Sequence, residues 1–342
     1  GFVYKRQEVF VHDRDTGTTE RVSVDSAGNQ GDNGSYYPSI SDDGQVVAFD
    51  SNATNLVADD ENLNRDVFVF DRSADTVEIA SRSVELLSVY GANDFSDIWN
   101  SGRSAVDSTG RYVAFYSRAS DLVTGDTNGR HDVFVRDRAT NTTERVSVDS
   151  AGNQANSDSQ QASISGDGRY VAFWSRATNL VTNDTNGSRY DVFVRDRALN
   201  TTELISINST GTQGDLDSYY PSISNDGRYV AFYSRATNLV PGDDNGRFDV
   251  FVHDRDTDTT ELVSVDSAGN QGNVDSYYPS ISADGRYVAF YSRATNLVAG
   301  DTNGRNDVFV RDRATNTTER VSVDSAGNQG NLDSYYPSIS AD

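Results

Sequence analysis

The amino-acid sequence predicts an all-β fold, a six-bladed β-propeller of four-stranded antiparallel blades formed by residues 1–342 as one domain. Two observations lead to this prediction: one phrase recurs along almost the whole chain, and each copy contains four short strand-like segments. The phrase DVFVRDR or a close variant begins at Asp66, Asp132, Asp191, Asp249 and Asp307, and EVFVHDR begins at Glu8. Such blades bury their faces by stacking around an axis. A solenoid is the competing architecture, but two tight and two longer connections per unit favour a blade.

The four strands of one unit follow in order along residues 279–324. The first is PSIS, and the second is RYVAFYS, whose Val, Phe and Tyr residues favour strands. The Asp-Gly pair between them is a hairpin signal. DVFVRD is the third strand, and TERVSVD, the fourth, alternates apolar and polar residues as a half-buried strand does. No segment has a sustained apolar period of 3.6 residues, so we expect almost no helix.

The repeats divide the chain into five complete blades and one split blade. The complete blades are expected at about residues 38–82, 103–149, 162–207, 221–265 and 279–324. Residues 1–24 supply three further strands, at 2–5, 8–13 and 18–24, and residues 337–342 supply the missing first strand. Pairing these strands across the two ends closes the ring and removes open sheet edges. We therefore expect six blades, one of them split between the N- and C-termini.

Residues 277–298, YYPSISADGRYVAFYSRATNLV, followed by DVFVRDR, resemble the repeats of TolB-like or PD40 β-propellers, which are WD40-like in architecture. The resemblance covers essentially the whole chain, since several phrases recur in the same order. It implies six blades and a largely non-catalytic protein. Repeats of this family usually carry Pro before the Asp-Gly turn. Here that position holds Asp42, Gly166, Asn225 and Ala283, so the turn is related but not identical.

The composition excludes several classes of function. The formal net charge of -23 argues against nucleic acid or an anionic membrane as a partner, because both attract clusters of Lys and Arg. There is no Cys, which excludes disulfides and thiolate metal sites. No apolar run is long enough to insert into a membrane. The absence of Met indicates a processed or partial product, and we expect an extracellular or cell-surface location, with the periplasm as the alternative.

A short acidic motif, Asp-x-Asn-Gly-x-x-Asp, follows the second strand of most units. The candidate metal ligands are Asp60, Asn62, Asp66, Asp126, Asn128, Asp132, Asp184, Asn186, Asp191, Asp243, Asn245, Asp249, Asp301, Asn303 and Asp307. Oxygen ligands at alternate positions, then a tight turn and a further carboxylate, are typical of calcium loops. We therefore expect calcium as a cofactor. The alternative is an Asn-Gly turn in which the Asp side chain bonds its own backbone.

Aromatic residues precede the first strand of most units. The candidate interface residues are Tyr36, Tyr37, Tyr219, Tyr220, Tyr277, Tyr278, Tyr335 and Tyr336, with Trp99 in the divergent second unit. An up-down strand order places them on the same face as the acidic loops. Exposed Tyr is enriched at interfaces and can stack on sugars. The alternative is that one Tyr of each pair packs between blades while the other covers a loop.

No constellation of residues points to catalysis. His12 and His253 share one repeat position, which holds Arg in other units, whereas a catalytic group should be unique and partnered. We expect Arg118 and its equivalents, which follow the second strand, to pair with a blade carboxylate.

The sequence therefore predicts a non-enzymatic extracellular structural protein, stabilised by calcium and self-assembling into a polymer or filament. Its partner is then a second copy of itself, or another extracellular protein or glycan. The alternative is a monomeric binding module that presents its loop face to a protein, a glycan or a small ligand.

Overall fold

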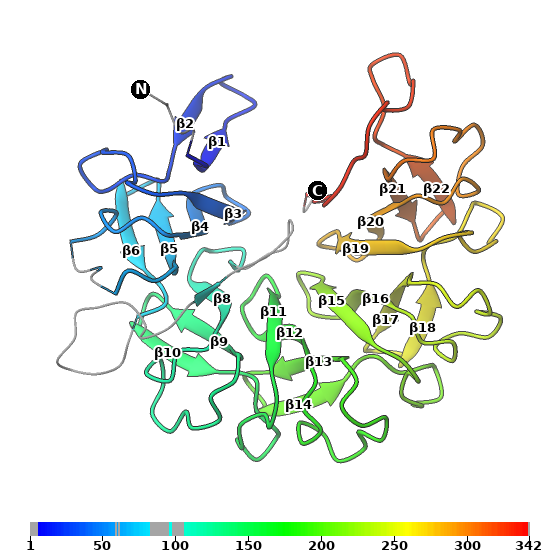
Figure 1. Cartoon of the computed structure of the whole chain (residues 1–342), viewed down its shortest axis with the longest axis horizontal. Helices are drawn as coiled ribbons and strands as arrows, with labels where there is room; N and C mark the ends of the chain where they lie inside the picture. The colour runs from blue at the N-terminus through cyan, green and yellow to red at the C-terminus, as the bar shows by residue number, and fades with distance from the viewer. Residues whose placement is uncertain (1–5, 59, 61, 83–95, 98–105, 341–342) are drawn as a thin grey trace.

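The blades form an open arc around a central axis in a computed structural model of the chain (Figure 1). The structure describes residues 6–58, 60, 62–82, 96–97 and 106–340. Within these ranges every regular element is a strand, as the sequence predicts. No helix in this part of the chain is long and apolar enough to cross a bilayer.

Five antiparallel sheets of four strands each form blades 1 to 5. Blade 1 consists of β3 (Ser35–Ile40), β4 (Val46–Ser51), β5 (Asp66–Asp71) and β6 (Thr76–Ile79). Blade 2 consists of β7 (Ser96–Asp97), β8 (Tyr112–Ser117), β9 (Asp132–Asp137) and β10 (Thr142–Arg145). Blade 3 consists of β11 (Ser159–Ile164), β12 (Tyr170–Ser175), β13 (Asp191–Asp196) and β14 (Thr201–Leu204). Blade 4 consists of β15 (Ser218–Ile223), β16 (Tyr229–Ser234), β17 (Asp249–Asp254) and β18 (Thr259–Leu262). Blade 5 consists of β19 (Ser276–Ile281), β20 (Tyr287–Ser292), β21 (Asp307–Asp312) and β22 (Thr317–Arg320).

The apolar pattern of each strand follows from its depth in the blade. Phe232 of β16 lies opposite Phe251 of β17, and the two buried rings stack with their centroids 5.9 Å apart. Both central strands are buried almost along their whole length, because neighbouring blades cover both faces. The outer strand β18 alternates instead, with Thr260 buried and Glu261 exposed. Dense Val and Phe in the second and third strands and alternation in the fourth are thus the expected result.

The prediction of six blades, one of them split between the termini, is wrong, because the described residues form five four-stranded blades. A two-stranded sheet of β1 (Phe10–His12) and β2 (Thr19–Arg21) lies beside blade 1 at one end of the arc (Figure 1). Residues 334–340 lie at the other end, beside blade 5, and do not form a strand. The strand predicted to pair with them, residues 2–5, lies outside the described residues.

The segment at the C-terminal end nevertheless has the position of a sixth inner strand. The backbone N–H of Ile339 donates to Ser280 Oγ at 3.3 Å. The same bond joins Ile281 to Ser222, at 3.2 Å, across the boundary between blades 4 and 5. The segment therefore packs on β19 as each inner strand packs on the one before it.

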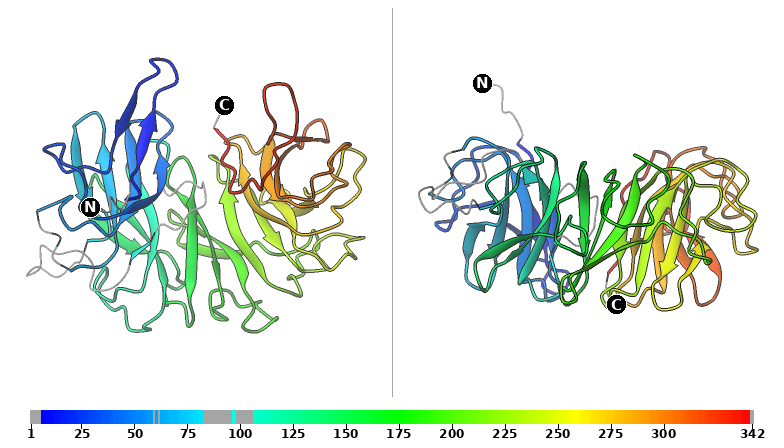
Figure 2. Two further views of the ribbon diagram at one scale, coloured as in Figure 1. Left: turned by 45° about the horizontal axis from the view of Figure 1, so that its top comes forward. Right: turned by 90° about the horizontal axis from the view of Figure 1, so that it is seen from below.

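The side view in Figure 2 shows that the strands run between two loop faces. On one face, the turns between the first two strands are hydrogen-bonded to one another around the axis. The N–H of Ser108 donates to Gly166 O, Gly166 to Asn225 O, and Asn225 to Ala283 O, at 3.1, 2.9 and 3.0 Å. The Asn225 amide also donates to Asp42 of blade 1 at 3.0 Å. Since blades 1 and 4 touch here, the axis is narrow on this face.

The long loops share the opposite face, as the up-down order predicts. In the segment that leads into blade 3, the carbonyl of Ala155 accepts a hydrogen bond from the Asn128 amide of blade 2 at 3.0 Å. The carbonyl of Gln154 in the same segment accepts a hydrogen bond from the Asn179 amide of blade 3 at 3.0 Å. Each such segment thereby connects the acidic loop of one blade to the long loop of the next.

Candidate functional site

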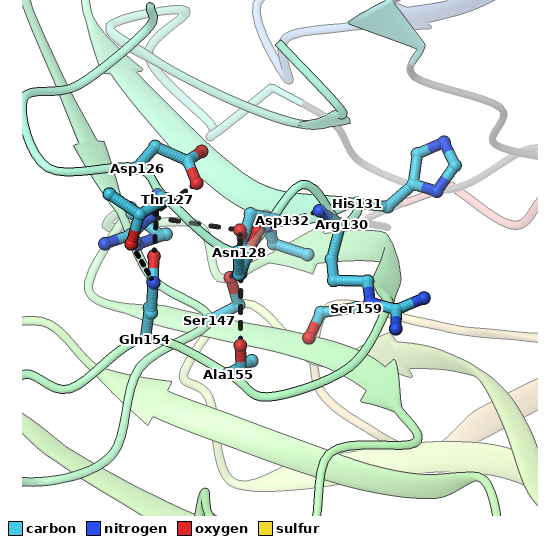
Figure 3. A network of polar contacts seen from close by, with 12 residues as sticks. Asp126, Thr127, Asn128, Arg130, His131, Asp132, Ser147, Gln154, Ala155 and Ser159 are labelled. Carbon is cyan, nitrogen blue, oxygen red and sulfur yellow. Dashed lines mark hydrogen bonds and ion pairs between the residues drawn. The ribbon is translucent and has the colours of Figure 1, made fainter. Parts of the chain in front are cut away.

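The second Asp of each acidic motif is a structural anchor. In blade 2, Asp132 accepts Ser147 Oγ–H at 2.5 Å and the Asn128 amide at 2.7 Å (Figure 3). Ser147 Oγ in turn accepts the N–H of Val133 at 3.0 Å. Burial raises the pKa of Asp132 to about 6. The carboxylate thus joins the acidic loop to the outer strand.

This anchor recurs in all five blades. The Asn-to-Asp bonds join Asn62 to Asp66, Asn128 to Asp132, Asn186 to Asp191, Asn245 to Asp249 and Asn303 to Asp307, at 2.7 to 3.0 Å. The Ser partners of these carboxylates are Ser81, Ser147, Ser206, Ser264 and Ser322, at 2.5 to 2.7 Å. Both oxygens of each second Asp therefore already accept donors from protein side chains.

The first Asp of the motif differs between blades. Asp126 of blade 2 lies 3.2 Å from Arg145, and Asp301 of blade 5 lies 3.7 Å from Arg320, both arginines belonging to the outer strand. In blade 3 this strand position holds Leu204, and the Gln213 amide donates to Asp184 at 3.0 Å instead.

In blades 1 and 4 the outer-strand position holds Ile79 and Leu262, and the first Asp has no cationic partner among the described residues. Burial raises the pKa of Asp60 and of Asp243 to about 6. One oxygen of Asp60, which is 6% exposed, has no hydrogen-bond partner in the described part of the chain.

The acidic loops do not all fit calcium equally. Across the ranges that the structure describes, no three or more His, Cys, Asp or Glu side chains are grouped to hold a metal ion. In blades 2 and 5 an arginine guanidinium lies beside the first Asp, in the place that a metal cation would take. In blade 3 a side-chain amide lies there. Among the described residues, Asp60 and Asp243 are the two buried first Asp residues without such compensation.

From blade 3 to the C-terminal segment, the tyrosine pairs form a continuous aromatic row near the axis. Tyr219 packs between blades, 5.7 Å from Trp174 and 5.0 Å from Tyr190 of blade 3. Tyr220 stacks on Tyr233 of its own blade at 5.5 Å. The second residue of each pair has positive φ, at Tyr37, Gln161, Tyr220, Tyr278 and Tyr336, between 51° and 56°. This bulged backbone turns the second ring back over its own blade.

Exposure varies along the row. Tyr36, Tyr37, Tyr219, Tyr220, Tyr277 and Tyr278 are half-buried, whereas Tyr335 and Tyr336 are exposed, at 48% and 53%. Trp99 lies outside the described residues. The sequence identified the pairs but not their partners Tyr233 and Tyr291, because these residues look like ordinary strand residues in RYVAFYS.

A cavity of about 540 Å³ lies on this face between blades 4 and 5. Tyr277, Tyr291 and Tyr335 line it together with Arg247, Arg293 and Asn306. Sequence reasoning missed this site. Its signal was Asn306, which stands at a repeat position that holds an aromatic or imidazole ring in blades 2 to 4.

Within the described residues the arginines after the second strand pair with no carboxylate, contrary to the prediction. Arg118, Arg235 and Arg293 donate through Nε to the carbonyls of Gly129, Gly246 and Gly304, at 3.2 to 3.4 Å. They therefore hold the glycine turn of the acidic loop.

The two histidines that share a repeat position also have structural contacts. His12 and His253 lie 2.7 and 2.9 Å from the hydroxyls of Thr19 and Thr260 on the adjacent outer strand. Burial lowers the pKa of His253.

The fold is similar to that of known propellers. A putative TolB from Agrobacterium tumefaciens is 14% identical with a TM-score of 0.50, and the match covers 92% of this chain and 88% of that one. Oligogalacturonate lyase in complex with manganese is 11% identical with a TM-score of 0.51, covering 92% and 70%. TolB from Acinetobacter baumannii is 15% identical with a TM-score of 0.49, covering 90% of this chain and 58% of that TolB chain.

No protein-family model matches the chain, and no curated protein matches it. Identities of this size show the fold alone. At that level the resemblance to TolB-like propellers that the sequence predicted is confirmed. The chain is therefore an all-β propeller of four-stranded blades that shares its fold with TolB.

Proposed function

We propose that this protein is a non-enzymatic structural propeller of the extracellular or periplasmic space, whose copies associate end to end into a polymer or filament. The observation that carries the proposal is the complementarity of the two ends of the arc. Each end exposes groups whose equivalents pair with one another at every internal blade boundary.

An ion pair repeats at each boundary. A Glu of the outer strand pairs with the Arg that follows the third strand of the next unit. The pairs are Glu20–Arg72, Glu78–Arg138, Glu144–Arg197, Glu203–Arg255 and Glu261–Arg313. By repeat position the next pair is Glu319 of blade 5 with Arg14 of the β1–β2 sheet. Both side chains are exposed, and neither forms an ion pair within the described residues.

Apolar side chains at the two ends of the arc are exposed, although their equivalents at internal blade boundaries are buried. Val321 and Val323 of blade 5 are 43% and 40% exposed, whereas the equivalent Val263 and Val265 of blade 4 are 1% and 5% exposed. At the other end Ile40 is 45% exposed, although its equivalent Ile281 is 7% exposed. Covering these three side chains is favourable, since apolar burial stabilises by roughly 25 cal/mol per Å².

The occupant of each end is a second copy of this chain. The two ends are different surfaces that fit each other, so the contact is heterologous and both halves are present on every copy. Such contacts propagate into a filament when the arc rises along its axis, and they close one ring when it does not. End-to-end association therefore repeats an interface that the chain already contains.

The test uses two charge reversals and size measurement by light scattering across concentration. Wild type forms species that grow with concentration. Arg14→Glu alone and Glu319→Arg alone remain near the 37.3 kDa of one chain, since each places like charges at the contact. An equal mixture of the two variants assembles again, because each head then meets an opposite tail.

Only contacts between copies are restored by mixing. A wild type that stays at the mass of one chain at every concentration would overturn the proposal and indicate closure within one ring. Assembly by either single variant to the same extent as wild type would also contradict it.

Calcium stabilisation belongs to the proposal at two loops only. Asp60 and Asp243 are buried carboxylates with no compensating arginine, and each has a second Asp and an Asn in the same loop. Oxygen atoms of this kind are the ligands that calcium prefers. In the other three loops the first Asp already has an arginine or an amide beside it, so calcium would gain less there.

A binding module is the second candidate. The cavity between blades 4 and 5 favours it, because aromatic walls and charged groups converge there on the loop face. A structural polymer can also carry such a site, so the two functions are compatible.

A further inference from the structure

One position of the repeat changes from a ring to an amide in blade 5. It holds His131, Tyr190 and Phe248 in blades 2 to 4 and Asn306 in blade 5. In blade 4 the Phe248 ring lies 5.6 Å from Tyr233, in edge contact, and 5.5 Å from Tyr277. The equivalents of these two tyrosines in blade 5 are Tyr291 and Tyr335. Asn306 has no ring to place between them.

A cavity of about 540 Å³ lies where that ring is missing. Tyr277, Tyr291 and Tyr335 form its walls, with Tyr291 5.8 Å from Tyr277 and 5.2 Å from Tyr335. In blade 3 Tyr190 lines the corresponding cavity, which measures about 340 Å³. The larger cavity has the size of a small-molecule pocket and walls already shaped around a six-membered ring.

The edge of the cavity is polar and incompletely paired. Arg189 and Arg305 lie 3.6 and 3.8 Å from the carboxylates of Asp217 and Asp333. Arg247, their equivalent beside the cavity, forms no such pair within the described ranges. Arg293 uses Nε and Nη2 on Gly304 O, at 3.4 and 3.2 Å, which leaves Nη1 free to donate.

Acceptors complete this edge. Asp275 accepts the N–H of Phe248 at 2.9 Å and also bonds the Tyr277 hydroxyl, and its remaining lone pairs can accept a ligand hydroxyl. The Asn306 amide nitrogen is directed to Asp333 at 3.3 Å, which leaves the amide oxygen as an acceptor. The cavity therefore offers two guanidinium donors and two oxygen acceptors around three aromatic rings.

We propose that this cavity binds one pyranose ring of a glycan. The C–H face of a pyranose packs on aromatic rings, and its hydroxyls donate to carboxylate and amide oxygens and accept from guanidinium groups. A plain aromatic ring fits the walls but leaves the charged edge desolvated and unpaired, which is unfavourable. Both halves of the site are matched only by a ring that is apolar on one face and polar at its edge.

The test is saturation-transfer NMR with methyl pyranosides of glucose, galactose, mannose, N-acetylglucosamine and glucuronic acid, and with p-cresol as the aromatic probe. Irradiating the protein's aromatic protons transfers saturation to ring C–H protons of at least one pyranoside in the wild type. Asn306→Phe restores the ring of blade 4 and lowers this affinity by about tenfold or more.

Asn306→Phe is a variant with a built-in control for folding. The chain already holds Phe248 at the same position, so the melting temperature of Asn306→Phe should match that of the wild type. Phe248→Asn opens the equivalent cavity in blade 4 and should add a second site for the same pyranoside.

Three results would overturn the inference. These are no transfer to any pyranoside, equal transfer in wild type and Asn306→Phe, and transfer to p-cresol alone. The inference is independent of end-to-end association, since Arg14→Glu leaves the cavity unchanged. A wild type that binds the pyranoside but does not assemble would contradict only end-to-end association. A wild type that assembles but does not bind the pyranoside would contradict only the sugar site.

Discussion

At the scale of single residues, glycines of the Asp-Gly turns do two things at once. Gly227 has φ of 75°, and a Cβ added there would lie 2.1 Å from the Tyr170 ring of the preceding blade. That ring cannot move aside easily, because Arg169 and Arg255 lie over it at 4.7 and 4.3 Å. The turn therefore needs glycine both for its backbone and for blade packing.

Gly227→Ala should destabilise the protein clearly more than Gly211→Ala. Gly211 also has positive φ, 77°, but nothing lies within 4 Å of its added Cβ. We expect about 1–2 kcal/mol for the left-handed backbone alone, and a further 1–3 kcal/mol or so for overpacking at Gly227. Chemical denaturation of both variants measures the difference. Equal losses would show that the contact with Tyr170 is without consequence.

At the scale of an element, the outer strand decides what each acidic loop can hold. Arg145 and Arg320 reach the first Asp of their loops, whereas Leu262 does not reach Asp243. The motif itself is nearly the same in each unit, so its chemistry depends on a side chain from a different strand. The sequence pattern does not show this difference, and it therefore predicts the same ligands in all five loops.

Calcium should raise the melting temperature of the wild type relative to chelator. Binding to the folded state stabilises by about 2.7 kcal/mol when free calcium is about 100 times the Kd. The variant Ile79→Arg/Leu262→Arg supplies the arginine found in blades 2 and 5, and it should lose this response. Superimposable wild-type melting curves in calcium and in chelator would remove calcium from the proposal.

At the scale of the whole molecule, the acidic charge and the buried carboxylates act together on stability. Burial raises the pKa of Asp191 to about 7 and of Asp243 to about 6. The folded state therefore binds protons that the unfolded chain releases near pH 3.8. Stability falls as pH rises through this window, and the net charge of -23 adds repulsion in the same direction.

The melting temperature without calcium should thus be higher at about pH 5 than at about pH 7.5. Below about pH 4 the sign reverses, because Arg228 lowers the pKa of Asp254, and that ion pair is lost as the carboxylate protonates. Asp191→Asn should reduce the slope between pH 5 and 7.5, roughly in proportion to the one titration it removes. A melting temperature that stays level or rises over this range would contradict the assignment.

The sequence by itself determined the strands, the four-stranded blade and the shared face of the long loops. These features depend on local signals that every copy repeats: dense Val and Phe in central strands, alternation in outer strands and Asp-Gly between the first two. The sequence also located the tyrosine pairs and the acidic motifs within each repeat. What each position contacts was not a local property, and only the tertiary structure decided it.

Closure of the ring is the clearest case. Residues 334–340 take the place of a sixth inner strand beside blade 5, yet the β1–β2 sheet remains at the far end of the arc. Joining them requires surfaces separated by almost the whole chain to meet, for which no local pattern exists. The cavity at Asn306 is similar, since its aromatic walls come from β19, β20 and the segment after blade 5. The repeat made the odd residue visible, and the packing of three separate segments made it a site.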